Sequence, residues 1–201
     1  MEKYVVTISR QFASMGRTIA QHMSQELGIE FYDRDIVEET ARRTGQSIAG
    51  ISQIEENGAS IFANRKYPLG MGLISMQQET FEVQSNIIRD LAKQESCIIV
   101  GRCADSVLRD VPRSLHIYVY APYEARMKNC VEKLEMDAKT AKKMIADVDK
   151  AREIYRLRYS EGVKSVLDHR HLLIDSSRFG PEMTAHLLSM IVKEAFCQEE
   201  G

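Results

Sequence analysis

The segment 97–100 constrains the fold more than any other part of the sequence, because it is an unbroken run of apolar residues, Cys-Ile-Ile-Val. A strand with one face in water alternates apolar and polar residues, whereas a strand covered on both faces can be apolar throughout. Gly101 follows the run directly and marks its end. The run therefore predicts a central strand of a parallel sheet that helices cover on both faces.

Four other segments carry a strand pattern, and helical patterns separate the strands. The predicted strands are residues 4–8, 31–33, 97–100, 114–120 and 172–174. The predicted helices include residues 19–27, 35–43, 73–94 and 181–196. In the first helix apolar residues recur every four positions, and Gly28 stands where a helix-ending glycine is expected. This alternation predicts an α/β fold with a three-layer, doubly wound, five-stranded parallel sheet and right-handed connections.

Three further segments lie between these elements. Residues 47–57 are weakly helical in pattern, and residues 58–72 form a stretch dense in glycine and proline that predicts a loop. Residues 122–168 predict a long, charged helical region. The length of 201 residues fits one domain with small insertions.

The composition excludes several classes of protein. Lysine and arginine total 27 against 29 aspartate and glutamate residues, and the net charge of -2 argues against a general binder of nucleic acid or of anionic membranes. No apolar run approaches about 18 residues, so we expect neither a transmembrane nor a secretory protein. The 4 cysteines and 5 histidines lack metal-type spacing, which predicts a reduced, cytoplasmic protein without structural zinc.

The loop after the first predicted strand, residues 9–18, is the first candidate site, because ligands bind at the carboxyl ends of strands in such sheets. The phosphate-loop pattern G-x-x-x-x-G-K-S/T combines glycine, a cation and a hydroxyl for phosphates and Mg²⁺. Gly16, Arg17 and Thr18 match its end with arginine in place of lysine, whereas Gln11 stands at the first glycine. The pattern alone fits phosphate binding and an ordinary strand-to-helix turn about equally well.

Several short motifs, taken in their order and spacing, resemble the cytidylate kinase-like family, a branch of the P-loop nucleoside monophosphate kinases. The motifs are Ile8-Ser9-Arg10, Gly16-Arg17, Leu27-Gly28-Ile29, Phe31-Tyr32-Asp33-Arg34, Val100-Gly101-Arg102 and Ile174-Asp175-Ser176-Ser177. The resemblance runs nearly from end to end. It implies one P-loop kinase-like domain over residues 1–201 with strand order 2-3-1-4-5, an acceptor-side insert at 45–72 and a helical lid at 122–168.

The resemblance also implies a donor site for ATP with Mg²⁺. Where the family usually has a glycine-rich SGGRE segment, this chain has Ser-Met-Gly-Arg-Thr at 14–18, so arginine at the lysine position is a family trait. The implied donor-binding residues are Arg10, Ala13, Ser14, Met15, Gly16, Arg17 and Thr18, with the hydroxyl of Thr18 on Mg²⁺. Ala13 and Met15 replace expected glycines, which restricts the backbone of a loop that cradles phosphate.

An acceptor site is implied at the ends of two other strands. Its residues are Asp33, Arg34, Gly101, Arg102 and Asp105. The alternative for Asp33 is a helix N-cap. For Arg102, a position at the carboxyl end of a strand favours a functional role over a structural one.

The chain departs from cytidylate kinases at three acceptor-side positions. Val100 and Cys103 stand where those enzymes carry aspartates, and Glu39 stands where an arginine for the acceptor phosphate is common. The residues that would have to supply the missing positive charge are Arg34, Arg42, Arg65 or Lys66. These departures leave the acceptor open.

The lid region carries a match to the family pattern D-x-x-R-x-x-Y, formed by Asp149, Arg152 and Tyr155. Lid arginines stabilise the charge that develops on the transferred phosphoryl group. The implied catalytic residues are Arg17, Arg152 and Arg156. The alternative, favoured for each lid cation other than Arg152, is a solvated helix face with i,i+4 ion pairs.

Three functions follow from these observations. We expect ATP-dependent phosphoryl transfer to a small acceptor, above all a pyrimidine nucleoside monophosphate such as CMP or dCMP. A nucleotide- or phosphate-binding module with little or no turnover is the second hypothesis, and a kinase of another small acceptor is the third. The expected partner is a small nucleotide rather than nucleic acid or a membrane, and the exposed surface of helix 73–94 would permit a homodimer.

Overall fold

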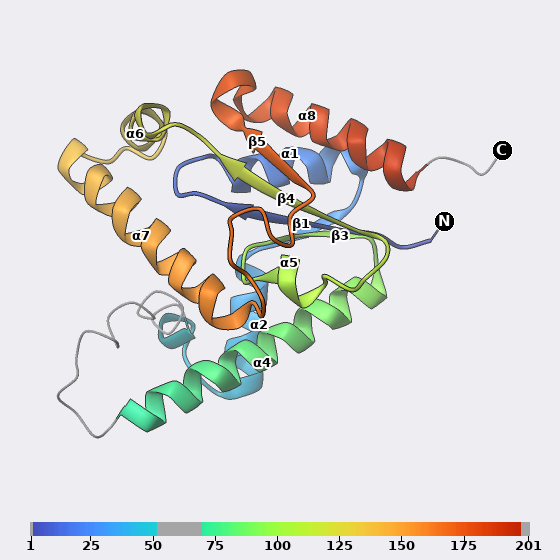
Figure 1. The fold of residues 1–201 in the computed structure, drawn as a ribbon, viewed down its shortest axis with the longest axis vertical. Coiled ribbons are helices and arrows are strands. Elements are labelled where there is room, and N and C mark those ends of the chain that lie inside the picture. The colour runs from blue at the N-terminus through green and yellow to red at the C-terminus, as the bar shows by residue number, and fades with distance from the viewer. Residues whose placement is uncertain (1, 52–69, 198–201) are drawn as a thin grey trace.

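The computed structural model describes residues 2–51 and 70–197, in which strands and helices alternate as the sequence predicts (Figure 1). In chain order the elements are β1 (Val5–Arg10), α1 (Gly16–Leu27), β2 (Glu30–Tyr32), α2 (Arg34–Thr44), α4 (Gly70–Gln94), β3 (Cys97–Val100), α5 (Ala104–Val107), β4 (Ser114–Tyr120), α6 (Tyr123–Glu132), α7 (Ala138–Tyr159), β5 (Leu172–Asp175) and α8 (Ser176–Phe196).

The strands form one parallel sheet in the order β2-β3-β1-β4-β5, which confirms the predicted fold class and strand order. β1 is central: its Val6 is in register with Ile98 of β3 and Leu115 of β4. All of β3 is buried, as its unbroken apolar run predicts. Because the strands are parallel, the loops that follow β1, β3 and β4 meet at one edge of the sheet.

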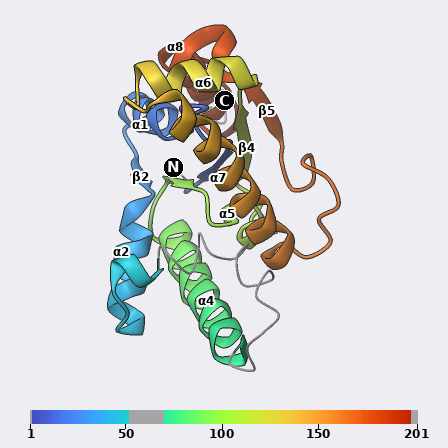
Figure 2. The same cartoon turned by 90° about the vertical axis from the view of Figure 1, so that its left-hand side faces the viewer.

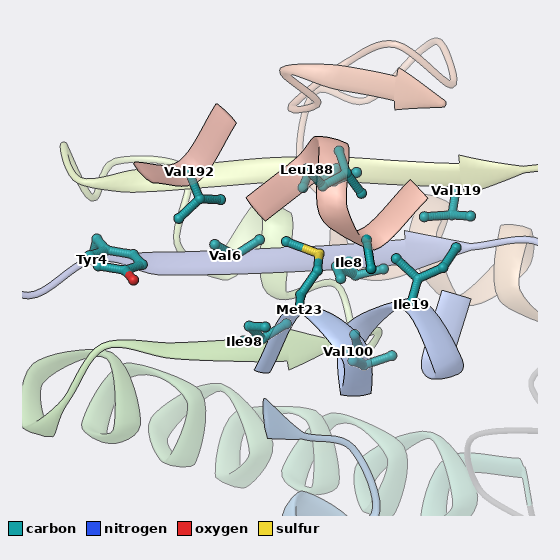
Figure 3. Packing of buried hydrophobic residues seen from close by; sticks show 13 residues of the cluster. Tyr4, Val6, Ile8, Ile19, Met23, Ile98, Val100, Val119, Leu188 and Val192 are labelled. Atoms are coloured by element: carbon teal, nitrogen blue, oxygen red, sulfur yellow. The ribbon is translucent and has the colours of Figure 1, made fainter. Parts of the chain in front are cut away.

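Helices pack against both faces of the sheet, with a different set on each face. Ile8 lies in a core with Met23 of α1 and Leu188 of α8 (Figure 3). Val5, three residues earlier in the same strand, lies in the core on the other face of the sheet, which includes Ile88 of α4. This alternation is the two-residue period of a strand, and each fully buried aliphatic side chain contributes roughly 1.5–3 kcal/mol. The three layers follow directly from it.

The last helix begins earlier than the predicted 181. Asp175 ends β5 and caps α8, because its carboxylate accepts a hydrogen bond from the backbone N–H of Ser177 at 2.9 Å. The helical path is then interrupted at Gly180, whose φ of 74° is left-handed, just before Pro181. The periodic pattern therefore identified only the part of the helix beyond this kink.

α4 is the longest of the described helices, with 25 residues. Its first turn occupies residues 70–72, which were predicted as loop. The rest of that predicted loop and most of the predicted acceptor-side insert, residues 52–69, lie outside the described residues. None of the helices that the structure describes is long and apolar enough to cross a membrane.

The charged region 122–168 consists of two helices, α6 and α7, followed by an irregular segment. Figure 2 shows α7 running from beside α6 toward α4. At its far end the Tyr155 hydroxyl donates to Gln84 Oε1 at 3.0 Å, and the ring of Tyr159 stacks on Phe81 with centroids 4.2 Å apart. These contacts hold α7 alongside the edge of the sheet where the strand ends meet.

Buried His116 of β4 should make the fold sensitive to acid. Its ring lies within hydrogen-bond distance of the hydroxyls of Thr7 (2.8 Å) and Ser114 (3.2 Å) and stacks on His171. Burial, aided by the nearby His171, lowers the pKa of His116 to about 4. Between pH 6.5 and 4 the unfolded chain therefore binds this proton more readily than the folded protein does. The free energy of unfolding contributed by His116 is fully present above pH 6.5, and on the order of 3 kcal/mol of it is lost as the pH falls toward 4.

Denaturant unfolding at several pH values checks this expectation. The His116→Gln variant should lose stability less steeply than the wild type between pH 6.5 and 4. Equal slopes for the two proteins would show that His116 is not the group responsible.

Candidate phosphate and acceptor site

The loop between β1 and α1 contains two left-handed residues at positions where the family resemblance leads us to expect glycine. Ala13 has a φ of 58° and Met15 a φ of 62°, both in the left-handed region that favours glycine. A residue with a side chain there costs roughly 1–2 kcal/mol. Ala13 and Met15 thus adopt left-handed conformations at the positions where the family resemblance leads us to expect glycine. Contacts with other parts of the protein must offset the conformational free energy that this costs.

Three contacts from distant elements hold this loop. The Asn129 amide of α6 donates to the carbonyl of Ala13 at 2.9 Å, and the Ser176 hydroxyl of α8 donates to the carbonyl of Ser14 at 2.7 Å. From α7, the Asp149 carboxylate accepts a hydrogen bond from the backbone N–H of Phe12 at 2.7 Å. The loop conformation is therefore set by tertiary contacts rather than by its own residues.

Gln11, which stands at the first glycine of the phosphate-loop pattern, also anchors the loop. Its backbone N–H donates to the carbonyl of Val119 at 3.0 Å, and its side-chain oxygen accepts from the N–H of Ala121 at 3.1 Å. Both partners lie at the end of β4 or just beyond it. The departure from glycine thus provides a link between the loop and the neighbouring strand.

The start of α1 has features that favour an anion. Its N-cap Met15 makes no side-chain capping bond, and its first turn carries no acidic residue. A Cβ atom on Gly16 would lie 2.8 Å from Cβ of Arg10, so only glycine fits there without a shift. Uncapped N–H groups and the positive end of the helix dipole favour an anion.

Thr18, in this first turn, is the residue predicted to meet Mg²⁺. Within residues 2–51 and 70–197, no group of three or more His, Cys, Asp or Glu side chains could hold a metal ion. Mg²⁺ in kinases usually takes most of its ligands from phosphates and water. A single hydroxyl beside a phosphate site is therefore compatible with Mg²⁺ bound together with a nucleotide.

Asp33 gathers three arginines from three parts of the chain. Its carboxylate lies 3.0 Å from Arg102 Nη1, 3.5 Å from Arg10 Nη2 and 3.5 Å from Arg17 Nε. Asp33 is buried and makes no side-chain capping bond to α2. The N-cap alternative therefore lacks its defining hydrogen bond, and the carboxylate instead joins residues 10–17, the predicted donor loop, to the end of β3.

Gly101 makes this arrangement sterically feasible. A Cβ atom there would lie 2.1 Å from Nη1 of Arg10, and its φ of 81° is left-handed. Arg102, which follows it, also donates from Nη1 to the carbonyl of Val100 at 3.1 Å. Gly101 thus leaves space for the Arg10 side chain, and the carbonyl of Val100 orients Arg102.

A cavity of about 930 Å³ lies beside this cluster. The predicted site residues that line it are Arg10, Asp33, Arg34, Gly101, Arg102, Asp105, Arg152 and Arg156. The loop residues 13–18 lie outside the lining, and Arg17 reaches the cluster through Asp33. The structure therefore brings the whole predicted acceptor set and both lid arginines to one cavity, with the donor loop beside it.

The two lid arginines are held differently. Arg152 Nη1 donates to the carbonyl of Arg10 at 3.1 Å, and burial lowers the pKa of its guanidinium. Arg156 is almost fully buried, and its Nη2 donates to the carbonyls of Ser165 and Asp168 at 2.8 and 3.0 Å. Arg152 thus contacts the donor loop, whereas Arg156 binds the segment after α7. Their catalytic roles remain predictions.

Sequence analysis missed several contributors to the site. Asn129 and Ser176 bind the loop backbone. No motif includes Asn129, and the motif that contains Ser176 did not indicate this contact. Arg170 lines the cavity from the irregular segment before β5, where neither periodicity nor a motif points to function. Tyr118 also lines the cavity, although its position in a strand pattern suggested packing alone.

Comparison with known proteins decides the family. The model of the cytidylate kinase-like family matches residues 5–178. The chain belongs to the cytidylate kinase-like family. Membership confirms the resemblance and places the chain among nucleotide-binding, kinase-like phosphotransferases. No curated protein matches the sequence.

Solved structures share the fold of this family member. An uncharacterized protein from Eubacterium ventriosum has a TM-score of 0.72 at 21% identity, with 95% of this chain and 99% of that chain covered. A sugar kinase from a Janibacter species has a TM-score of 0.56 at 17% identity, covering 97% and 96%. Shikimate kinase from Acinetobacter baumannii, in complex with shikimate, has a TM-score of 0.53 at 16% identity, covering 96% of each chain. At these identities the likeness shows the fold alone.

Proposed function

We propose that the protein transfers the terminal phosphoryl group of ATP to a small acceptor, and that the acceptor is a pyrimidine nucleoside monophosphate such as CMP or dCMP. The observation that carries the proposal is the ion cluster around Asp33. It joins Arg17 of the donor loop to Arg102 at the acceptor cavity. A phosphoryl group has to pass between two such sites.

The donor side is formed by the loop and the first turn of α1. The uncapped helix start and Arg17 would hold the phosphates of ATP, with the Thr18 hydroxyl available to Mg²⁺. ATP would supply the phosphoryl group, and Mg²⁺ would neutralise charge on its oxygens. Arg17 is half-exposed and lies 3.5 Å from Asp33, so it can exchange this partner for a phosphate.

The acceptor side combines charged and apolar walls. The cavity lining includes the charged side chains of Asp33, Arg34 and Arg102 and apolar side chains such as Ile48 and Met144. A nucleoside monophosphate likewise combines an anionic group with a flat, less polar base. Arg152, held against the donor loop, would stabilise charge on the transferred group, because a guanidinium in a low-dielectric site acts strongly on nearby oxyanions.

Two other functions each have an observation in their favour. Val100 is fully buried and offers only its carbonyl, so the site lacks the carboxylate that cytidylate kinases carry there. This favours a nucleotide-binding module with little turnover. Glu39 is paired with Arg42 and Arg43 outside the cavity lining, which favours a different small acceptor. The structural neighbours named for shikimate and a sugar make those molecules reasonable probes.

A thermal-shift panel and a coupled assay for ADP release test the proposal. ATP stabilisation together with CMP-dependent ADP production would support it. Stabilisation without production from any monophosphate, shikimate or sugar would support the binding module, and production with a non-nucleotide acceptor alone would support the different kinase. If ATP, ADP and the monophosphates all fail to stabilise the protein with Mg²⁺ present, the donor and acceptor sites are wrongly placed.

A further inference from the structure

A second cluster of buried charges lines the cavity around Asp105. Asp105 is 2% exposed, and its carboxylate accepts hydrogen bonds from the Ser9 hydroxyl at 3.2 Å and the backbone N–H of Ser106 at 3.1 Å. Nε of Arg170, a side chain that is 4% exposed, lies 3.6 Å from the same carboxylate. The Arg170 guanidinium lies over the ring of Tyr118, 3.8 Å from its centroid, which fixes its plane.

Arg156 is the second cation of this cluster. It is 5% exposed and lines the same cavity. Among the described residues, Nε and Nη1 of Arg156 and Nε of Arg170 are buried without a hydrogen-bond partner. Burial and the charge of Arg156 both lower the pKa of Arg170, as expected for two guanidiniums held near each other.

The cluster therefore contains a buried guanidinium whose hydrogen bonds are not all made. Arg170 is paired with Asp105, and Arg156 lies near the charge of Asp168, but the buried Nε and Nη1 of Arg156 lack an acceptor. Burying a charge without compensation is costly, and a guanidinium binds oxyanions through paired N–H groups. An anionic group of a ligand would supply the missing acceptors.

The acceptor needs such a cation source, because the family arginine near position 39 is absent. Glu39 accepts hydrogen bonds from Arg42 and Arg43, which lower its pKa to about 2. Arg42, one of the predicted substitutes, is 74% exposed and lies outside the cavity lining. Arg34 does line the cavity but is exposed, and the remaining substitutes, Arg65 and Lys66, lie outside the described residues.

We propose that Arg156 and the neighbouring Arg170, which is paired with Asp105, form an oxyanion subsite that binds the anionic group of the acceptor and replaces the arginine missing near position 39. This inference rests on the proposed phosphotransferase function. For a nucleoside monophosphate the bound group is its phosphate, and a carboxylate can likewise accept two parallel N–H bonds from a guanidinium. Arg156 is then an acceptor-binding residue, and Arg170 becomes part of the site although no motif includes it.

Binding measurements with CMP and cytidine test the subsite, because these ligands differ only in the phosphate. In Arg170→Met and Arg156→Met the dissociation constant for CMP should rise about 10- to 100-fold, the usual value of a charged hydrogen bond, whereas that for cytidine should stay within about twofold. Arg109→Met, an exposed arginine outside the cavity lining, is the matched control and should bind both as the wild type does. A CMP-to-cytidine ratio unchanged in both variants would overturn the proposal.

A second measurement tests the subsite without replacing Arg156 or Arg170, so it does not depend on whether those variants fold. It also applies if the acceptor is a molecule other than CMP. In the Arg17→Ala background, which weakens the donor loop, inorganic phosphate or acetate is titrated against chloride at equal ionic strength. The Nε–Hε NMR signals of Arg156 and Arg170 should shift with phosphate, or with acetate alone if the ligand is a carboxylate. If neither anion moves either signal, the subsite is wrong. If these shifts are seen but the wild-type protein neither binds ATP nor turns over, the proposed function is contradicted and the subsite is not.

Discussion

Replacement of Arg152 by alanine is expected to lower kcat for phosphoryl transfer by about 10²- to 10³-fold, the usual effect of removing one fixed donor to developing charge. The Arg152 guanidinium donates to the Arg10 carbonyl at 3.1 Å, and its burial lowers its pKa because the charge is removed from water. It thus lies at the base of the donor loop and lines the acceptor cavity. A charge held in that position acts on the transferred group without first having to be oriented.

Steady-state kinetics with ATP and the acceptor check this expectation. The loss should appear in kcat, with KM for ATP changed far less. Lys150→Ala is the matched control, because Lys150 lies on the same helix, is exposed and lies outside the cavity lining. Wild-type kcat in Arg152→Ala, or an equal loss in Lys150→Ala, would show that this arginine has no specific role in the transfer.

Asp33→Asn should reduce both stability and activity. The carboxylate lies near Arg10, Arg17 and Arg102, and its side chain is 9% exposed. Removing its charge leaves the three guanidiniums to repel one another, and loss of one partner of a buried ion pair costs about 3 kcal/mol. We expect the free energy of unfolding to fall by about that amount, and phosphoryl transfer to fall at least about tenfold as the arginines move apart.

The same substitution distinguishes the two roles considered for Asp33. Asparagine is as good an N-cap as aspartate, so a capping residue would tolerate the change with almost no loss of stability. Denaturant unfolding of Asp33→Asn beside Asp35→Asn, an exposed aspartate in the same helix, separates the cases. Equal stabilities of the two variants would favour the cap and contradict the arginine cluster.

Local patterns were sufficient to predict the helices and strands and much of the acceptor set. The unbroken run 97–100 predicted a buried strand, and the helix-ending glycine at Gly28 has the expected left-handed φ of 65°. Gly101 and Arg102 could be placed at the cavity because parallel strands end at one edge of the sheet. Each of these inferences depends on residues close together in the chain.

Such local patterns did not predict the contacts between segments that are distant in the chain. The sequence shows that Ala13 and Met15 are not glycines, but not that Asn129, Asp149 and Ser176 hold their loop in the left-handed conformation. The loop residues alone suggested a damaged phosphate cradle. The structure shows left-handed residues at Ala13 and Met15 all the same, with hydrogen bonds from three other elements to the carbonyl and N–H groups of the loop.

The sequence by itself determined the α/β class, the parallel sheet and its family, because strand and helix periods and short motifs depend on neighbouring residues. Only the tertiary structure decided which charges meet: Asp33 with three arginines, and Asp105 with Arg170. The partners of these ion clusters come from different crossovers of the sheet. Their pairing is settled by how helices and loops pack in space, for which the spacing of residues along the chain carries no signal.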